Sequence, residues 1–377
     1  MIVANATCHW LCTGDTIFPA MLSAIDTAIK SVDLEVYIYE ESPLGLRFRD
    51  ALVRAADRGV RVRVLIDAIG SYYLSDRFWD PLRKVGGKVR VFNPVALKRV
   101  TLRDHRKLLV CDGQLAFIGG FNIAPVYEGD GVACGWCDVG MKVEGAIVRQ
   151  LAVSFEEMFS RADLKHKLFI HFHKTGAKKS TGVPPEQIFF TGPGLGRNPF
   201  GRALRRDLRN AKNVQIVMAY FLPALRLRRA LTRVVRRGGR VQLILPTKSD
   251  VPISLLAARS LYRRLLRAGV EIHEYQPQIL HAKLIIVDDV VYLGSANLDT
   301  RSTHINYELV LRFENPAMAA EAREIFDRTK ERCRQVTGKE WRKSRTFWSG
   351  LKQRWAYFLL NKIDPYVSLR QWRALPD

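Results

Sequence analysis

The feature that most constrains the fold is a set of four segments that occurs twice along the chain, in the same order. Matched residues of the two copies stand 176 to 182 positions apart, so the spacing is nearly constant. Four ordered matches at one spacing do not arise by chance, and we therefore infer an internal duplication. The matched segments are VDLEVYIYE with NVQIVMAYF, RGVRVRVLID with RGGRVQLILP, GGKVRVFNP with AGVEIHEYQ, and DHRKLLVCDGQLAFIGGFN with LHAKLIIVDDVVYLGSAN.

Helical and strand patterns alternate within each copy. In the first copy, apolar residues near helical spacing at 18–31 precede the β-branched run 32–40, and a second helical pattern follows at 44–59. Gly59 suits the C-terminal end of that second helix. The alternation predicts two similar α/β sandwich halves with mixed, mainly parallel sheets, and an active site at their pseudo-twofold interface.

The duplication also predicts the domain organisation. The halves are expected at 1–160 and 198–335, with a linker at 161–197 that contains one short strand, and a tail at 336–377. The linker holds three histidines, but no carboxylate or cysteine is regularly spaced with them, so we do not expect a metal site there: His166, His171 and His173.

The last matched segment of each copy places a histidine and a lysine two positions apart. These pairs are His105 with Lys107 and His281 with Lys283. Positions two apart share one face of a strand, so the imidazole and the ammonium of each pair point the same way. We expect the two pairs to meet around one cavity at the pseudo-twofold axis.

An acidic turn follows each pair. The hairpin turns are predicted at Asp112-Gly113 and Asp288-Asp289. The second hairpin is one residue shorter, which predicts a tighter turn and a slight shift of the residues after it. The position of Asp112 and Asp288 favours a role in supporting the hairpins over contact with substrate.

Two histidines and two lysines around one cavity suit a phosphate group. The ammonium groups neutralise phosphate oxygens. One imidazole can attack phosphorus and the other can protonate the leaving oxygen, since the pKa of histidine lies near neutrality. Small residues and amide or hydroxyl donors follow each hairpin and are expected to let the backbone approach the ligand or to hydrogen-bond it: Gly120, Asn122, Ser295 and Asn297.

A nucleophilic imidazole also needs a hydrogen-bond acceptor on its far nitrogen. Each copy offers one acid on the strand after the hairpin, Asp138 in WCDVGMKVEG and Glu308 in INYELVLRFE. These carboxylates are the expected partners of the two histidines.

The two motifs, His105-x-Lys107-x4-Asp112 and His281-x-Lys283-x4-Asp288, resemble the duplicated HxKxxxxD signature of the phospholipase D superfamily. The resemblance covers roughly residues 12–335. It counts all six motif residues as catalytic, needs no metal or other cofactor, and favours His105 as the nucleophile, although near-symmetry alone leaves that choice open.

The stretches after each hairpin, GGFN with WCDVGMKVEG and GSANLDTRSTHINYE, look like those of bacterial cardiolipin synthases, especially the shorter type without N-terminal membrane helices. That family implies a phosphatidyltransferase that passes a phosphatidyl group from phosphatidylglycerol through a phosphohistidine to a second phospholipid. The acceptor stays open, because phosphatidylglycerol, phosphatidylethanolamine, glycerol and water all offer a suitable oxygen. The oligomeric state stays open as well.

The charge of the chain points to a polyanionic partner. Lys and Arg number 60 against 37 Asp and Glu, for a net charge of +23, which suits an anionic membrane or a nucleic acid equally. A phosphodiesterase acting on phospholipid or nucleic acid is therefore the alternative, and a non-enzymatic membrane protein is a third. We expect phosphatidylglycerol and the membrane surface to be the partners, with nucleic acid disfavoured.

The tail favours the membrane. Trp341, Trp348 and Trp355 are spaced by seven, which would place them on one helical face, and many Lys and Arg lie between them. No apolar run approaches the roughly 20 residues needed to cross a bilayer, and no signal peptide is apparent. We expect a peripheral protein on the cytoplasmic face of the cell membrane.

The cysteines are expected to be incidental, with a local disulfide or a shared metal at Cys134 and Cys137 as the alternative. Cys134 and Cys137 form a CGWC stretch with redox or metal-ligand spacing, but no second such pair exists. Cys111 lies in an apolar run and is expected in the core.

Overall fold

The computed structural model describes residues 6–95, 100–163, 180–181, 185–193, 198–344 and 346–373. The three linker histidines lie outside these ranges. Among the helices that the structure describes, none combines the length and the apolar character required to cross a bilayer.

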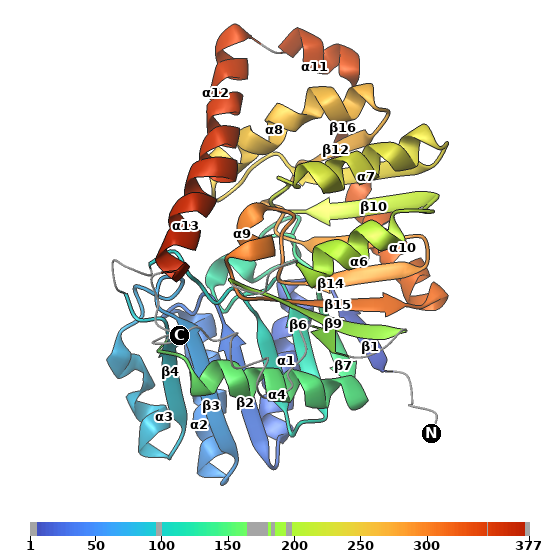
Figure 1. Cartoon of the computed structure of the whole chain (residues 1–377). Helices are drawn as coiled ribbons and strands as arrows, with labels where there is room; N and C mark the ends of the chain where they lie inside the picture. The colour runs from blue at the N-terminus through green and yellow to red at the C-terminus, as the bar shows by residue number, and fades with distance from the viewer. Residues whose placement is uncertain are drawn as a thin grey trace.

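The first half is built on one sheet with helices on its faces (Figure 1). The order of its strands across the sheet is β1-β7-β6-β5-β2-β3-β4. Its elements are β1 (Thr7–Leu11), α1 (Gly14–Thr27), β2 (Ser31–Val36), α2 (Pro43–Asp57), β3 (Arg61–Asp67), α3 (Asp80–Lys84), β4 (Lys88–Phe92), β5 (Leu108–Cys111), β6 (Leu115–Gly119), β7 (Gly140–Glu144) and α4 (Ala146–Ser160), with short 3₁₀ turns at Asp76–Trp79 and Pro125–Tyr127.

The second half repeats this arrangement, with the strand order β16-β12-β11-β10-β13-β14-β15-β9-β8. Without its two edge strands, the order matches that of the first half strand for strand. Its elements are β8 (Ser180–Thr181), β9 (Glu186–Thr191), α6 (Pro199–Asp207), β10 (Asn213–Met218), α7 (Leu225–Arg236), β11 (Arg240–Pro246), α8 (Pro252–Arg267), β12 (Glu271–Tyr275), β13 (Lys283–Val287), β14 (Val290–Gly294), α9 (Thr300–His304), β15 (Glu308–Glu314), α10 (Pro316–Lys330) and β16 (Cys333–Val336).

The predicted pair of similar α/β halves with mixed sheets is confirmed, but "mainly parallel" is wrong. In the first sheet the parallel pairings within the described residues are β2 with β3 and β3 with β4, and the other four are antiparallel. Parallel pairing needs a crossover connection, which only the strand–helix–strand units supply. The motif hairpins and the strands after them add antiparallel neighbours.

Two smaller expectations need correction. Part of the predicted linker, 161–197, belongs to the second sheet, because β9 pairs with β15 as β1 pairs with β7. The first hairpin turn has three residues, since Cys111 pairs with Leu115. The second has two, as Val287 pairs with Val290, so the tighter turn is confirmed.

Local signals explain several helix ends. The hydroxyl of Ser42 accepts a hydrogen bond from Gly45 N, and Pro43 occupies the first turn of α2. Gly59 follows the end of α2 with a φ of 87°, a conformation that glycine adopts at little cost, as expected from its place in the sequence.

The halves meet through a shared apolar core. One buried cluster contains Val110 and Ile118 from the first hairpin together with Leu284 and Leu293 from the second. Cys111 is buried, as expected. The contact surface between the halves is therefore formed by the same hairpins that carry the histidine–lysine pairs.

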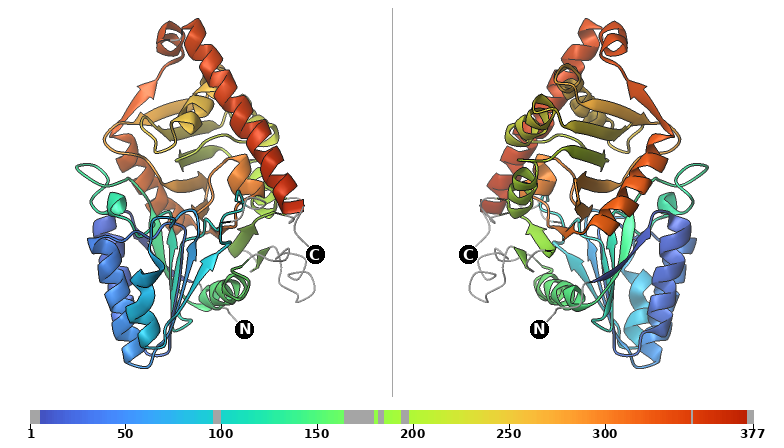
Figure 2. Two further views of the ribbon diagram at one scale, coloured as in Figure 1. Left: turned by 90° about the vertical axis from the view of Figure 1, so that its left-hand side faces the viewer. Right: turned by 90° about the vertical axis from the view of Figure 1, so that its right-hand side faces the viewer.

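The tail forms α11 (Gly338–Ser344), α12 (Phe347–Phe358), a π-helical turn (Leu359–Ile363) and α13 (Asp364–Arg373). From α12 to α13 it makes one long rod along an edge of the molecule (Figure 2). Ala356 packs against Leu222 and against Ala257 of α8.

The prediction that three tail tryptophans share one helical face is wrong for Trp341. This residue lies in α11 and packs on Tyr262, with ring centroids 4.8 Å apart. Trp348 and Trp355 lie in α12 and are 69% and 58% exposed. The tail thus docks on the second half and also presents aromatic side chains to solvent.

Candidate active site

Just before each motif strand, the backbone pairs with a segment of the opposite half. Asp104 forms a parallel bridge with Tyr307, and Leu280 forms the equivalent bridge with Cys137. His105 N donates to Tyr307 O at 3.0 Å, and His281 N donates to Cys137 O at 2.8 Å. Each motif histidine is therefore held beside the acid-bearing segment of the opposite half.

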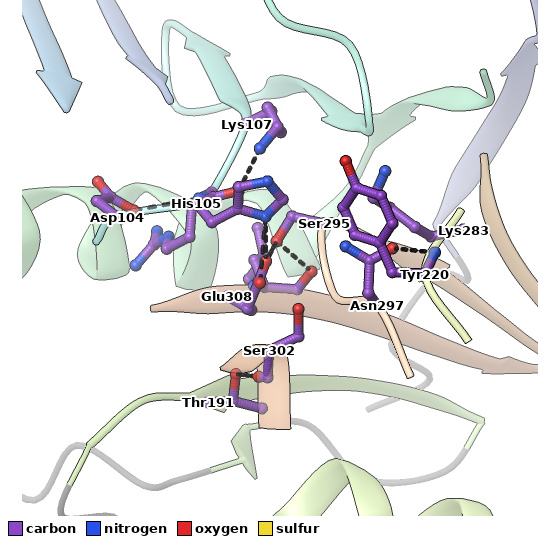
Figure 3. Close-up of polar contacts among 12 residues, drawn as sticks. Asp104, His105, Lys107, Thr191, Tyr220, Lys283, Ser295, Asn297, Ser302 and Glu308 are labelled. Carbon is purple, nitrogen blue, oxygen red and sulfur yellow. Dashed lines mark hydrogen bonds and ion pairs between the residues drawn. The ribbon is translucent and has the colours of Figure 1, made fainter. Parts of the chain in front are cut away.

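His105 is oriented by Glu308, which comes from the second half. Its Nδ1 lies 3.1 and 3.0 Å from the two carboxylate oxygens. Figure 3 shows the His105 imidazole facing the Glu308 carboxylate. Ser295 Oγ donates to Glu308 Oε2 at 2.5 Å and fixes that carboxylate in turn. The ring of Tyr37 packs edge-on against the imidazole at 4.9 Å. With Nδ1 engaged by Glu308, an attack by His105 would come from Nε2.

His281 is oriented by Asp138, which comes from the first half. The distance between His281 Nδ1 and Asp138 Oδ2 is 2.6 Å. The imidazole lies beside the rings of Tyr127 and Trp136, with centroids 5.3 and 5.5 Å away. Lys283 Nζ stands 3.0 and 3.2 Å from the two ring nitrogens.

The sequence identified both carboxylates, but it did not indicate that the pairs cross between the halves. Glu308 is the first residue of β15, whereas Asp138 lies two residues before β7 begins at Gly140. Asp138 therefore does not sit on the following strand, as had been expected. The crossing makes each half incomplete without the other.

Both lysines are buried beneath the histidines. Lys107 Nζ donates to His105 O at 2.6 Å. Burial lowers the pKa of Lys107 to about 7, although Glu308 opposes the shift. Burial also lowers the pKa of Lys283, against the opposing effect of Asp138. A bound anion would raise both pKa values, so the lysines are suited to a negatively charged ligand.

The two imidazoles differ in their electrostatics. Burial, together with Lys107 and Lys283, lowers the pKa of His105 well below its usual range. Burial and Lys283 also lower the pKa of His281, but Asp138 works against them. Both imidazoles are thus neutral at pH 7 in the free protein, but His281 is the easier of the two to protonate, because Asp138 opposes the lowering of its pKa.

The pKa values of the two carboxylates, Glu308 and Asp138, are shifted in opposite directions. Burial raises the pKa of Glu308 to about 7, despite Lys107 and Ser295. For Asp138, burial alone would raise the pKa, but His281 and Lys283 together lower it below its usual value. Asp138 is therefore the firmly ionised member.

The histidines line a cavity of about 470 Å³, to which both halves and the tail contribute. Asn122 and Asn297 line it too, but their amide oxygens accept hydrogen bonds from Ile38 N and Tyr220 N. The Asn122 amide nitrogen also donates to Tyr127. Asn122 therefore serves to hold the walls of the cavity, and it is not the free donor expected from the sequence.

Gly120 and Ser295 also act through the carboxylates. A Cβ at Gly120 would stand 2.2 Å from Asp138 Oδ1, so glycine makes room for that side chain and does not simply open the backbone to a ligand. Ser295, its counterpart after the second hairpin, bonds Glu308.

Asp112 and Asp288 contact the backbone at the hairpin turns, in agreement with the supporting role that their position in the sequence favours. Asp112 accepts hydrogen bonds from the backbone nitrogens of Lys30 and Ser31, and Asp288 from those of Lys212 and Asn213. Both lie at the hairpin turns, beyond the far ends of β5 and β13. Their place in the motif reflects support of the hairpins.

Sequence reasoning missed a buried brace behind His105. Asp67 accepts hydrogen bonds from Asp104 N at 2.9 Å and from Arg103 Nη1 at 3.2 Å. The signal was a charged residue ending an apolar strand in RGVRVRVLID, where the second copy has Pro246.

The mouth of the cavity was missed as well. Arg301 lines it and pairs with Asp364 of α13 at 2.5 Å, and Leu360 of the tail lines it too. These residues reach the cavity only when the tail folds against the second half, and their spacing in the sequence does not predict this contact.

Within the described part of the chain, no group of three or more His, Cys, Asp or Glu side chains is arranged to hold a metal. Cys134 and Cys137 are unlinked.

These features are those of a duplicated phospholipase D-type site. A sequence profile of the family described as "Cardiolipin synthase, PLD-like domain" matches residues 21–127 and 204–330, and the chain belongs to this family.

Two curated relatives of the chain are named as cardiolipin synthases. The chain is 35% identical over 302 residues to the major cardiolipin synthase ClsA of Bacillus subtilis, covering 78% of this chain and 62% of that protein. It is 32% identical over 338 residues to a cardiolipin synthase of Clostridium perfringens, covering 86% and 70%. The chain thus spans somewhat under two thirds of the length of the Bacillus relative.

A solved structure shares the fold. The phosphatidylserine synthase of Haemophilus influenzae superposes with a TM-score of 0.74 at 16% identity, covering 96% of this chain and 95% of that one. At this level of identity the likeness concerns the fold alone.

Proposed function

We propose that the protein is a phosphatidyltransferase, which moves a phosphatidyl group from phosphatidylglycerol through a phosphohistidine to the hydroxyl of a second phospholipid. The observation that carries the proposal is the pair of crossed His–carboxylate contacts around one cavity, His105 with Glu308 and His281 with Asp138. The names of the curated relatives support the lipid substrate.

In the first step, Nε2 of His105 attacks the phosphorus of phosphatidylglycerol. The P–O bond to the glycerol headgroup breaks, and His281, which takes up a proton when the anionic donor binds beside it, gives that proton to the leaving oxygen. Glycerol departs, His281 is left neutral, and the phosphatidyl group is bonded to His105. Lys107 and Lys283 offset the charge on the non-bridging phosphate oxygens.

In the second step, the hydroxyl of the acceptor lipid loses its proton to neutral His281 and attacks the phosphorus. The N–P bond breaks and His105 is regenerated. When the acceptor is another phosphatidylglycerol, the product is cardiolipin, and His281 is protonated again for the next cycle.

Attachment to the cytoplasmic face of the membrane is part of this proposal. Phe347, Trp348, Leu351, Trp355 and Phe358 of α12 are all at least 39% exposed and follow one another along the helix. Exposed aromatic residues with basic neighbours suit the interfacial region of a bilayer. Deleting the tail would not test this cleanly, because its inner face packs on α8 and lines the cavity. Trp348→Ser with Trp355→Ser changes the exposed face alone.

The test is incubation of the purified protein with phosphatidylglycerol in mixed micelles, with products identified by mass spectrometry. We expect cardiolipin and glycerol in equal amounts. Phosphatidic acid alone would make the protein a hydrolase, and cleavage of DNA without a lipid product would favour the nucleic-acid phosphodiesterase.

A further inference from the structure

A second basic site lies away from the histidines, in a groove between α7 and α8. Its volume is about 660 Å³, and it is lined by four arginines of α7, three of α8 and Arg354 of α12. No Asp or Glu is among the described residues that line it. Figure 1 shows α7, α8 and α12 at the same end of the second half. We call this feature the arginine groove.

The arginines of this groove are not explained by ion pairing. Neither α7 nor α8 contains Asp, Glu or Lys. Among the residues that the structure describes, no carboxylate pairs with any arginine of the groove, and Arg228 is held by the hydroxyl of Tyr357 at 3.0 Å. Like charges on one surface repel each other, so this arrangement costs free energy unless an anion binds.

The duplication provides an internal comparison. In the first half, α2 occupies the place of α7, and its arginines are balanced: Arg49 pairs with Asp50 at 2.8 Å and Arg54 with Asp26 at 2.9 Å. The same fold therefore forms with paired arginines on this helix in the first half, and the unpaired row belongs to the second half.

The residue type indicates the ligand chemistry. Every cation in the groove is an arginine, whose planar guanidinium binds phosphate oxygens through two parallel hydrogen bonds. Leu225, Leu261 and Leu265 also line the groove, so it combines phosphate-binding groups with apolar surface.

The neighbouring helix indicates where the phosphate comes from. Arg354 lines the groove, and one turn away on α12 stand the exposed side chains of Leu351 and Phe358. The same helical rod continues from Arg354 to Leu360 and Asp364, which line the active-site cavity. Arg354 thus lies within the aromatic stripe, and the residues that line the cavity come after it along the tail; the stripe is the row of exposed residues Phe347, Trp348, Leu351, Trp355 and Phe358 of α12.

We propose that the arginine groove binds the phosphate groups of anionic phospholipids in the bilayer surface, as a site distinct from the catalytic cavity. With the aromatic stripe inserted beside it, the groove sets the α12–α13 rod against the membrane and brings the cavity mouth to the lipid. The inference rests on the proposed function for the identity of the surface, but its test does not depend on catalysis.

The test compares two full-length variants that each lose four positive charges. The groove variant carries Arg233→Gln, Arg263→Gln, Arg264→Gln and Arg267→Gln. The control carries the same change at four exposed arginines elsewhere, each without an ion pair among the described residues: Arg77, Arg149, Arg202 and Arg332. Thermal unfolding confirms that both variants are folded.

Binding is measured by co-sedimentation with phosphatidylcholine vesicles that contain phosphatidylglycerol, at moderate salt. We expect the groove variant to bind up to about a thousandfold more weakly than wild type, because each of the four basic residues at an anionic surface adds about 1 kcal/mol. The control should change by less than about threefold. Turnover of short-chain, monomeric phosphatidylglycerol should be the same in both.

Three results would overturn the proposal. The groove variant could sediment like the control. Inorganic phosphate, at the concentration of the lipid phosphate, could release wild type from the vesicles, which would identify a site for soluble phosphate. The groove variant could lose binding to single-stranded RNA while keeping its vesicle affinity, which would identify a nucleic-acid surface. Failure of the proposed function appears separately, as absence of a lipid product with wild type.

Discussion

The two halves share one strand order, but the residues that contact the histidine differ between them. His105 faces a glutamate that a serine hydroxyl holds, whereas His281 faces an aspartate beside which a glycine leaves room. The His281–Asp138 contact is the shorter, at 2.6 Å against 3.0 Å. The His105 side chain is the more exposed, at 12% against 5%. Duplication thus supplied two similar scaffolds, and a few substitutions made one histidine suited to attack and the other to hold a proton.

The support behind the histidines differs too. Asp67 and Arg103 brace the backbone before His105, and Pro246 stands where a second such aspartate would be. We infer that the first half fixes its histidine more firmly, as a nucleophile that must meet phosphorus in line requires. Variants that act on one half at a time should reveal this difference between the two histidines.

Removing either histidine should abolish transfer from phosphatidylglycerol, but in distinguishable ways. We expect His105→Ala and His281→Ala each to lower kcat/KM by about 10⁴-fold or more. A donor with a nitrophenol leaving group needs no acid, so it should restore headgroup release to His281→Ala alone. His9→Ala, at an exposed position, is the control. Equal rescue of both variants would mean that the histidines are interchangeable.

Replacing Gly120, beside Asp138, should lower activity more than replacing Ser295, beside Glu308. Gly120→Ala puts a Cβ 2.2 Å from Asp138 Oδ1, so it must displace that carboxylate, and we expect kcat to fall about 10²- to 10³-fold. Ser295→Ala removes one hydrogen bond to Glu308 and should cost about tenfold. The kcat of each folded variant is measured by steady-state kinetics. A larger decrease in kcat for Ser295→Ala than for Gly120→Ala would contradict the account.

The lysines should set the alkaline limit of activity. The pKa of Lys107 in the free protein is lowered to about 7 by burial, so the ammonium form is lost as pH rises through that value. We expect kcat/KM for an anionic donor to fall severalfold from pH 7 to 8. Lys107→Arg, whose guanidinium stays charged, should be slower overall but should not show this fall. A flat profile for wild type over this range would exclude Lys107 as the titrating group.

The motif aspartates should affect stability and leave chemistry intact. Asp112→Asn and Asp288→Asn weaken hydrogen bonds to backbone N–H groups at the hairpin ends, and each should lower the free energy of unfolding by about 1–2 kcal/mol. The kcat of the folded protein should stay within about twofold of wild type. Denaturant unfolding and initial rates measure the two effects, and a large loss of kcat without loss of stability would return these residues to the catalytic group.

The sequence predicted the parts of this site that depend on local spacing. Each His–Lys pair needs only the two-residue period of a strand, and repetition of the pair revealed the duplication. It did not predict the crossing of His105 to Glu308 and His281 to Asp138, because that depends on how two separate sheets meet. The prediction of mainly parallel sheets is wrong for a related reason. Alternation of helices and strands describes only the crossover units, and it does not describe the antiparallel hairpins beside them.

The tail shows the same limit. Spacing by seven suggested one continuous helix through Trp341, but the helix is interrupted before α12, and Trp341 instead packs on Tyr262. The exposed positions of Trp348 and Trp355 agree with the pattern. The contribution of Asp364 to the cavity mouth depends on tertiary packing, which the pattern does not contain.

The central claim is that two unequal histidines from two halves form one site, with His105 as the nucleophile. Its most direct test is acid-free rapid quenching of the protein during turnover of phosphatidylglycerol, followed by peptide mass spectrometry. We predict one phosphatidyl group per chain, bonded to His105, and a higher yield of this adduct in His281→Ala when the donor has a nitrophenol leaving group. An adduct on His281, or adducts on both histidines, would contradict the account.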